Sequence, residues 1–323
     1  MRLVNLRRTV LIGLFGVILV ACGGQAPGGS VAPSIDSSTI LAEVATFEVV
    51  VDRPERLLLA LVSADNRWLS FGEVQMSFSY AGDGSDSPPP AEPMPDTVGH
   101  FLPIPGTPTS GADVPTLTFA TEGRGVYTAQ VTFPQVGFWQ VLAQGETADG
   151  SAFAAEAALQ VVATPSLLSV GDVAPKSDNP IAGDPDVPPS AIDSRASEEV
   201  PIPDPELHAI SIADAIAAGH PALVVFSTPV YCVSRFCGPV TDLVAELADR
   251  YADRADFIHV EIYRDFTAGE INQTALDWLQ APDGNFREPW IFLVGADGRI
   301  VGSWDTLVTR EELEPVLAAL PPK

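Results

Sequence analysis

Two cysteines five residues apart, Cys232 and Cys237, lie between a short apolar run and an amphipathic segment. The apolar run, residues 222–226, has the length and composition of a buried strand. After Cys237, apolar residues recur at helical spacing, at Val240, Leu243, Val244, Leu247, Ala248 and Tyr251. Any fold of this chain must therefore place two sulfur atoms in a strand-to-helix connection.

Helix geometry restricts where each cysteine can lie. Residues five apart in an α-helix are separated by about 7.5 Å along the axis and about 140° around it. Bridged cysteines need Cα atoms within about 7 Å and converging side chains. A disulfide Cys232–Cys237 therefore requires Cys232 in the loop and Cys237 at the start of the helix, where Pro239 also fits the first turn. The unpaired N–H groups of that turn lower a thiol pKa, so we expect Cys237 to attack and Cys232 to resolve or pair with it.

The remaining residues up to 323 alternate between strand and helix patterns. Asp297-Gly298 predicts a tight hairpin turn, and Thr309 with Glu312 predicts a capping box that opens the last helix. The expected helices cover 211–218 and 271–279, and the expected further strands cover 257–262, 290–294 and 299–303. The predicted order is β-α-β-α-β-β-α, which describes an α/β domain over 206–323.

That order, with a cysteine motif after the first strong strand and a proline before a later one, is similar to the thioredoxin fold. Pro289, in Arg287-Glu288-Pro289-Trp290-Ile291, matches the cis-proline that faces the redox site in that superfamily. The resemblance implies a cis peptide bond at Pro289. It also implies a site made of Cys232, Cys237 and Pro289, with Pro289 shaping the groove for a protein substrate.

The motif departs from the Trp-Cys-Gly-Pro-Cys of thioredoxins, and two registers fit. Phe236-Cys237-Gly238-Pro239-Val240 overlays it with a valine in place of the second cysteine. Alternatively Tyr231-Cys232 overlays Trp-Cys, and the spacer has grown to four residues. Thioredoxins also carry a buried acid in the strand before the motif, which 222–226 lacks, so proton transfer needs another group.

Residues 40–164 predict an all-β domain. Strands are expected over 45–51, 56–62, 73–80, 117–121, 126–133, 138–144 and 153–162, with a long loop over 82–114. In the clearest hairpin, one face of the first strand carries Tyr127, Ala129, Val131 and Phe133. The second strand, which contains Trp139 and Val141, runs back beside it. This hairpin resembles immunoglobulin-like modules such as the YtkA-like and FixH-like extracytoplasmic domains. The predicted fold class is therefore multidomain, an immunoglobulin-like sandwich followed by a thioredoxin-like domain, with 165–205 as a disordered linker because Pro, Asp and Ser dominate it.

The N-terminus has the layout of a secretory signal. Arg2, Arg7 and Arg8 precede a nearly apolar stretch over 9–20. The following Leu19-Val20-Ala21-Cys22 resembles the lipobox of bacterial lipoproteins. The resemblance implies a signal peptide over 1–21, acylation of Cys22, including palmitate, and a flexible tether over 22–39. We therefore expect a protein anchored by lipid at the extracytoplasmic face of the cell membrane; an uncleaved anchor helix is the alternative.

The net charge of the chain limits which classes of partner it can bind. The formal charge is −25, and loss of residues 1–21, which hold three arginines and no acid, makes it −28. Such a surface repels phosphate backbones, so no nucleic-acid partner is expected. The histidines at 100, 208, 220 and 259 are scattered, so no metal ligand set and no cofactor are expected. Glu261, Asp265 and Glu288 are expected to be solvated.

Three functions remain open at this point. The first is a membrane-anchored thiol-disulfide oxidoreductase that acts on protein thiols or disulfides, with a protein substrate or redox partner. The second is a non-enzymatic binding lipoprotein whose Cys232–Cys237 disulfide is structural. The third is a copper-handling protein of the SCO type, in which two cysteines are joined by a distal histidine; His259 is the last histidine of the chain.

Overall fold

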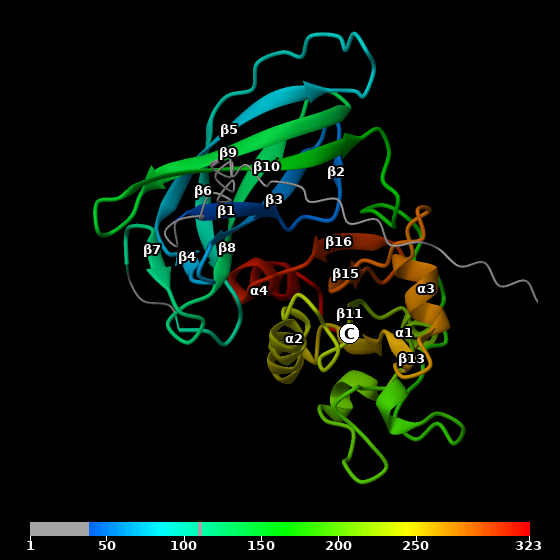
Figure 1. The fold of residues 1–323 in the computed structure, drawn as a ribbon. Coiled ribbons are helices and arrows are strands. Elements are labelled where there is room, and N and C mark those ends of the chain that lie inside the picture. The colour runs from blue at the N-terminus through cyan, green and yellow to red at the C-terminus, as the bar shows by residue number, and fades with distance from the viewer. Residues whose placement is uncertain (1–38, 109–111) are drawn as a thin grey trace, which may run out of the picture. The chain divides into compact units, whose positions relative to one another are not determined.

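The computed structural model describes residues 39–108 and 112–323 (Figure 1). The predicted signal peptide over 1–21, the lipid anchor Cys22 and all but the last residue of the tether over 22–39 lie outside the described residues. Among the helices of the described part, none is long and apolar enough to cross a bilayer.

The N-terminal β-region, residues 40–162, is built on one hydrogen-bonded path of strands (Figure 1). Neighbouring strands run antiparallel except for the short pair β10 and β2. The path follows the order β2-β10-β9-β5-β6-β8-β3-β4-β7, with β1 paired to β3. The strands are β1 Ile40–Val44, β2 Val49–Val50, β3 Pro54–Ser63, β4 Trp68–Ser70, β5 Glu73–Gly82, β6 Thr97–Pro103, β7 Thr116–Thr118, β8 Gly125–Thr132, β9 Gly137–Glu146 and β10 Ala152–Val162.

Strand periodicity explains the core of this region. On β8 the side chains of Tyr127, Ala129 and Val131 point inward, and Trp139 and Val141 of β9 meet them in one buried cluster. The two strands and their inward-facing residues are present, but the predicted hairpin is wrong: β8 pairs with β3 and β6, whereas β9 pairs with β10 and β5. The hydroxyl of Tyr127 is satisfied by donating to the carbonyl of Phe71 at 2.7 Å, as a buried phenol requires.

Two strand predictions are wrong. The residues expected to form a long loop over 82–114 include β6, which pairs with β5 on one side and β8 on the other. The strand expected over 45–51 is largely irregular, and β1 comes earlier in the chain, where it pairs with β3. Both errors have one cause: pairing across the sheet decides which of several extended segments becomes a strand.

The C-terminal region, residues 206–323, contains a four-stranded mixed sheet with helices on both faces (Figure 1). The strand order is β12-β11-β15-β16, with β12 parallel to β11 and the others antiparallel. Its elements are η2 Pro205–His208, α1 Ile212–Ala218, β11 Ala222–Ser227, α2 Cys237–Tyr251, β12 Asp256–Glu261, β13 Tyr263–Asp265, β14 Glu270–Ile271, α3 Gln273–Leu279, β15 Trp290–Val294, β16 Ile300–Asp305 and α4 Arg310–Ala318. The predicted order of helices and strands is present, with the small β13–β14 pair added.

Successive side chains of β11 point to opposite faces of the sheet, and different helices cover the two faces. Leu223 and Val225 pack in a cluster with the apolar stripes of α2 and α4. Val224 and Phe226 point to the opposite face, where α1 and α3 cover them. The predicted capping box is present at the start of α4, where the backbone N–H of Thr309 donates to the Glu312 carboxylate at 2.9 Å.

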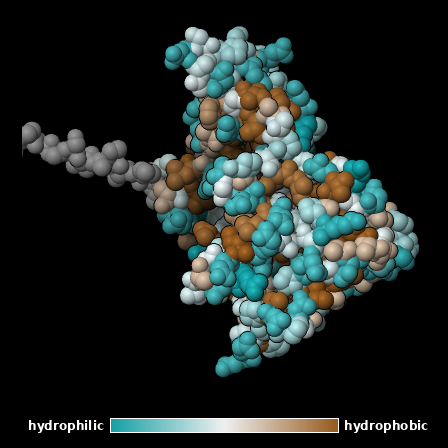
Figure 2. Space-filling view, turned by 90° about the vertical axis from the view of Figure 1, so that its right-hand side faces the viewer, coloured by the Kyte–Doolittle hydropathy of each residue, from teal (hydrophilic) through white to brown (hydrophobic). Residues whose placement is uncertain are grey.

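β3 joins the two regions. Leu57, Leu59 and Leu61 lie in the core of the β-region, whereas Leu58 and Ala60 share a cluster with α2, α4 and the C-terminal sheet. The run is apolar at every position because both of its faces are buried. On the face drawn in Figure 2, hydrophobic residues form separate patches between hydrophilic ones.

Residues 165–205 correct the prediction of a disordered linker. They form an irregular strap on the C-terminal region, and Ile192 and Asp193 are fully buried. Its polar groups are bonded: Asn179 accepts from the N–H of Ile212 at 2.8 Å, Ser177 from the indole of Trp278 at 3.0 Å, and the carbonyl of Ala191 from Asn272 at 3.0 Å. Its composition wrongly indicated disorder, because hydrogen bonds and the packing of small side chains, rather than large apolar side chains, hold the strap in place. The 3₁₀-helix η1, Pro189–Ala191, lies within it.

Candidate functional site

Cys232 and Cys237 form a disulfide whose Cα atoms are 6.0 Å apart. β11 ends at Ser227 and α2 begins at Cys237, so Cys232 lies in the connecting loop. The sequence-based placement of the two residues is therefore confirmed, and it follows from the strand-to-helix pattern together with the limits of helix geometry.

The two sulfur-bearing residues differ in access. Cys237 is completely buried, whereas Cys232 is partly exposed. The backbone N–H of Cys237 donates to Sγ of Cys232 at 3.4 Å, and Oγ of Ser234 lies 3.2 Å from the same sulfur. The contacts differ from those expected for an attacking Cys237: the first N–H group of α2 is directed at Cys232, which is also the residue that solvent reaches.

Pro289 begins the turn into β15. The Glu288–Pro289 peptide bond is cis, as predicted. The carbonyl of Pro289 accepts a hydrogen bond from the N–H of Thr306 at 2.9 Å, which fixes this turn against the end of β16. Pro289 itself is buried.

A cleft of about 610 Å³, here called the cysteine cleft, lies between the β-region and the cysteine loop. Most of its lining is apolar. Val44, Val62 and Trp68 line it from the β-region, and Cys232, Phe236 and Glu288 line it from the C-terminal region. Val233, at the tip of the loop, also lines the cleft and is 96% exposed. The partly exposed sulfur therefore opens into an apolar groove.

Two carboxylates expected to be solvated are withdrawn from solvent: Glu261 is buried and Glu288 is partly buried. Burial, together with the charge of Glu261, raises the pKa of Glu288 to about 7. Oε2 of Glu288 is buried and has no hydrogen-bond partner among the described residues. Burial also raises the pKa of Glu261, whose Oε2 accepts from the N–H of Ser194 at 2.8 Å. Asp265 is exposed, as expected. Both carboxylates lie outside the strand 222–226: Glu261 is on β12, and Glu288 directly precedes Pro289.

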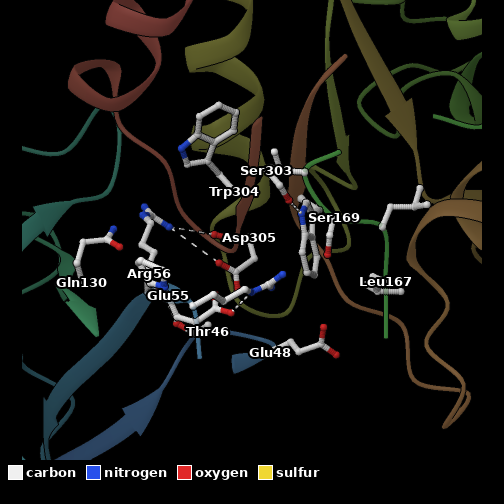
Figure 3. Close-up of a pocket in the computed structure, with 15 residues that line it drawn as sticks. Thr46, Glu48, Glu55, Arg56, Gln130, Leu167, Ser169, Ser303, Trp304 and Asp305 are labelled. Carbon is white, nitrogen blue, oxygen red and sulfur yellow. Dashed lines mark hydrogen bonds and ion pairs between the residues drawn. The ribbon is translucent and has the colours of Figure 1, made fainter. Parts of the chain in front are cut away.

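A second cavity, of about 370 Å³, contains no residue of the cysteine loop (Figure 3). Arg56 extends across it from β3 toward Asp305 at the end of β16 (Figure 3). Nε of Arg56 donates to Glu312 at 2.7 Å, and a further N–H donates to the carbonyl of Leu307. These charged groups pair with one another across the contact between the β-region and the C-terminal region. We therefore interpret the cavity as part of that contact.

The histidines correct a further expectation. His208, at the end of η2, and His259, on β12, lie close together, and Asp193 of the strap lies against both. All three are buried, and burial lowers the pKa of His208. Scattered positions in the sequence thus converge on one ligand-like cluster. His259 faces this cluster, which among the described residues includes no cysteine.

Comparison of the chain with models of known protein families, with curated proteins and with solved structures finds no match.

Sequence reasoning missed Glu288, Trp68 and Asp193 as parts of functional clusters. One sequence feature pointed to Glu288, namely its position directly before Pro289. No sequence feature pointed to Trp68 or Asp193, because each reaches its cluster through a contact with a segment far away in the chain.

Proposed function

We propose that this chain is a lipid-anchored, extracytoplasmic thiol-disulfide exchange protein, with an immunoglobulin-like sandwich over 40–164 and a thioredoxin-like domain over 206–323. Support for the domain assignment comes from the element order, from a cysteine at the start of α2 and from the cis peptide bond at Pro289. The observation that carries the function is the asymmetry of the disulfide. One sulfur opens to a cleft and accepts an N–H from the helix start, and its partner is buried.

This asymmetry assigns the steps of exchange. A substrate thiolate attacks Sγ of Cys232; the Cys232–Cys237 bond breaks, and the sulfur of Cys237 leaves as a thiolate and takes up a proton. A second substrate thiolate then attacks the mixed disulfide, which releases Cys232 as a thiolate and forms a substrate disulfide. Two electrons pass from the substrate to the cysteine pair, and the reverse sequence reduces a substrate disulfide.

The helix start favours the anionic form of Cys232. An N–H group directed at sulfur, together with the positive end of the macrodipole of α2, stabilises a thiolate more than a thiol. Cys232 is therefore the nucleophile of the reduced protein and the sulfur attacked in the oxidised protein.

Glu288 is the candidate proton carrier. It shares the cysteine cleft with Cys232, and one of its oxygens has no partner within the described residues. A carboxyl group whose pKa lies near 7 exchanges protons efficiently at neutral pH. Glu288 would accept a proton from an attacking thiol and return it to the departing sulfur.

The cleft favours a polypeptide as the substrate. Apolar side chains of β1, β3 and β4 line the wall opposite Cys232, and they offer contact area that a small thiol cannot use. A second thiol-disulfide protein would restore the cysteine pair after each turnover. The lipid on Cys22, proposed from the sequence, would hold these reactions at the membrane surface.

The test uses the full chain in detergent and glutathione disulfide as the probe. Cys237→Ser should form a mixed disulfide between Cys232 and glutathione, detected by mass. Cys232→Ser, the matched control, should react at least about tenfold more slowly, because its remaining thiol is buried. The wild-type pair should equilibrate with glutathione at a reduction potential above about −300 mV.

Resistance of the native disulfide to reduction below that potential would favour the binding lipoprotein with a structural disulfide instead. The copper-handling alternative is less well supported, because the side chain of His259 is directed at Asp193 and His208.

A further inference from the structure

Three buried side chains from separate segments meet beneath the cysteine loop. Asp193 comes from the strap, His208 from η2 and His259 from β12; their exposed fractions are 0%, 0% and 1%. One potential ligand atom from each lies within 4.8 Å of the other two. The two rings pack edge to face, with centroids 5.2 Å apart.

Three ring nitrogens of this cluster lack hydrogen-bond partners among the described residues. Nδ1 of His259 and both ring nitrogens of His208 are buried without a partner within the described residues. Oδ2 of Asp193 lies 3.5 Å from Nε2 of His208 and 3.4 Å from Nδ1 of His259, without hydrogen-bond alignment. Buried polar groups of native proteins are nearly always paired, so these atoms require a ligand.

The orientation of His259 is fixed from outside the cluster. Its Nε2 lies 3.1 Å from the carbonyl of Ser227, which can only accept, so Nε2 carries the hydrogen. In the neutral ring the lone pair of Nδ1 then faces the carboxylate of Asp193. The lone pair of Nδ1 and a lone pair of the Asp193 carboxylate therefore face one another in the protein interior, away from water. A cation bound between them would remove their repulsion. A backbone carbonyl that orients a ligating imidazole is a common arrangement in metal sites.

The spacing fits one transition-metal ion. Zn–N and Zn–O bonds are about 2.0–2.2 Å long, so neighbouring ligand atoms of a tetrahedral site lie about 3.3–3.5 Å apart. The two separations measured from Asp193 match this value, and the ligand atoms of the two histidines lie within 4.8 Å of each other. The three side chains would fill three positions of the tetrahedron, with a water molecule in the fourth. Arg195 donates to the same carboxylate, from Nη2 to Oδ2 at 2.7 Å and from Nε to Oδ1 at 3.0 Å. Asp193 keeps capacity for a metal, because a carboxylate offers about four lone-pair sites.

From this geometry we infer that Asp193, His208 and His259 bind one Zn²⁺ ion. Imidazole nitrogen with a carboxylate oxygen is a donor set that suits zinc. The site is closed to solvent, so the ion has a structural role: it fastens the strap to η2 and β12. Ser194, next to Asp193, accepts from the N–H of Val230 at 3.2 Å, so the same ion steadies the strand-to-loop turn before Cys232.

The first experiment measures metal in the full chain, produced without a histidine tag and purified in detergent without chelators. We expect about one zinc per chain by elemental analysis. After removal of the metal with a chelator, calorimetric titration with Zn²⁺ should restore one equivalent. Thermal unfolding should shift upward by about 5 °C or more at Zn²⁺ concentrations about a hundredfold above the dissociation constant. Absence of stoichiometric binding would overturn the inference.

Variants locate the ion. His208→Gln and Asp193→Asn should each weaken Zn²⁺ binding at least about tenfold. His220→Gln is the matched control, because His220 belongs to the same region but pairs with Asp256 outside the cluster. Equal loss in the control would place the ion elsewhere and refute the site. If a cluster variant fails to fold, X-ray absorption of zinc in the wild-type chain decides, since a spectrum without imidazole scattering contradicts the assignment.

Discussion

The backbone N–H of Cys237 points at the sulfur of Cys232, 3.4 Å away. In the proposed exchange this contact reverses the roles expected from the sequence, because the helix start acts on the neighbouring sulfur and not on that of its own residue. Under that proposal the buried Cys237 is the resolving thiol and the leaving group.

The first prediction concerns alkylation. In the fully reduced chain, iodoacetamide should modify Cys232 before Cys237, by at least about tenfold in rate, because Cys232 is accessible and its thiolate is favoured. Mass mapping of the modified peptides over time measures both rates. Faster modification of Cys237 would contradict the assignment of the nucleophile.

The second prediction concerns the pH dependence of stability. The folded state holds the proton of Glu288 more tightly than the unfolded chain does, since burial raises its pKa from 4.5 to about 7. The contribution of Glu288 to stability is therefore complete below pH 4.5 and is lost as the pH rises through about 7. Relative to Glu288→Gln, the wild type should lose up to about 3 kcal/mol between about pH 5 and pH 8. Urea unfolding at each pH measures the difference.

Glu270→Gln is the control for this prediction, because Glu270 is exposed on β14. It should follow the wild-type curve. A Glu288→Gln curve parallel to the wild type would show that the carboxyl of Glu288 titrates normally and is no proton carrier.

The third prediction tests the cysteine cleft as a polypeptide groove. Val233→Ser should slow exchange with a cysteine-containing peptide about threefold and leave exchange with dithiothreitol unchanged, because only the peptide contacts the loop tip. Val230→Ser is the matched control, since Val230 is exposed but does not line the cleft. Parallel changes with both probes would indicate damage to the disulfide rather than to the groove.

The fourth prediction concerns the joint between the two regions. Arg56→Ala should lower the free energy of unfolding by about 2 kcal/mol, because it removes the ion pair with Glu312 and leaves the carbonyl of Leu307 without the Arg56 donor in a largely buried place. The midpoint of thermal unfolding should fall by about 4–8 °C. Arg53→Ala removes an exposed partner of Glu55 and should cost less than about 0.5 kcal/mol. Equal losses of stability in the two variants would contradict the conclusion that Arg56 links the two regions.

Local pattern predicted much of the C-terminal region. The stripe from Val240 to Tyr251 became α2, the apolar run over 222–226 became most of β11, and Thr309 with Glu312 capped α4. These features depend on neighbours a few residues away, so periodicity and capping chemistry are sufficient to reveal them. The placement of Cys232 in the loop also followed, because helix geometry forbids the alternative.

Long-range contacts decided the rest. The strap looked disordered because its order comes from Ile212, Asn272 and Trp278, which lie far along the chain. Strand β6 exists because β5 and β8 flank it, and Asp193 meets His208 and His259 only after the strap has packed. The sequence alone determined the main helices and strands of the C-terminal region, the place of Cys237 at the start of α2 and that of Cys232 in the loop before it. Only the tertiary structure decided which sulfur is exposed, which acid is buried beside it and which histidines meet, because burial and convergence belong to the packed chain and not to its local pattern.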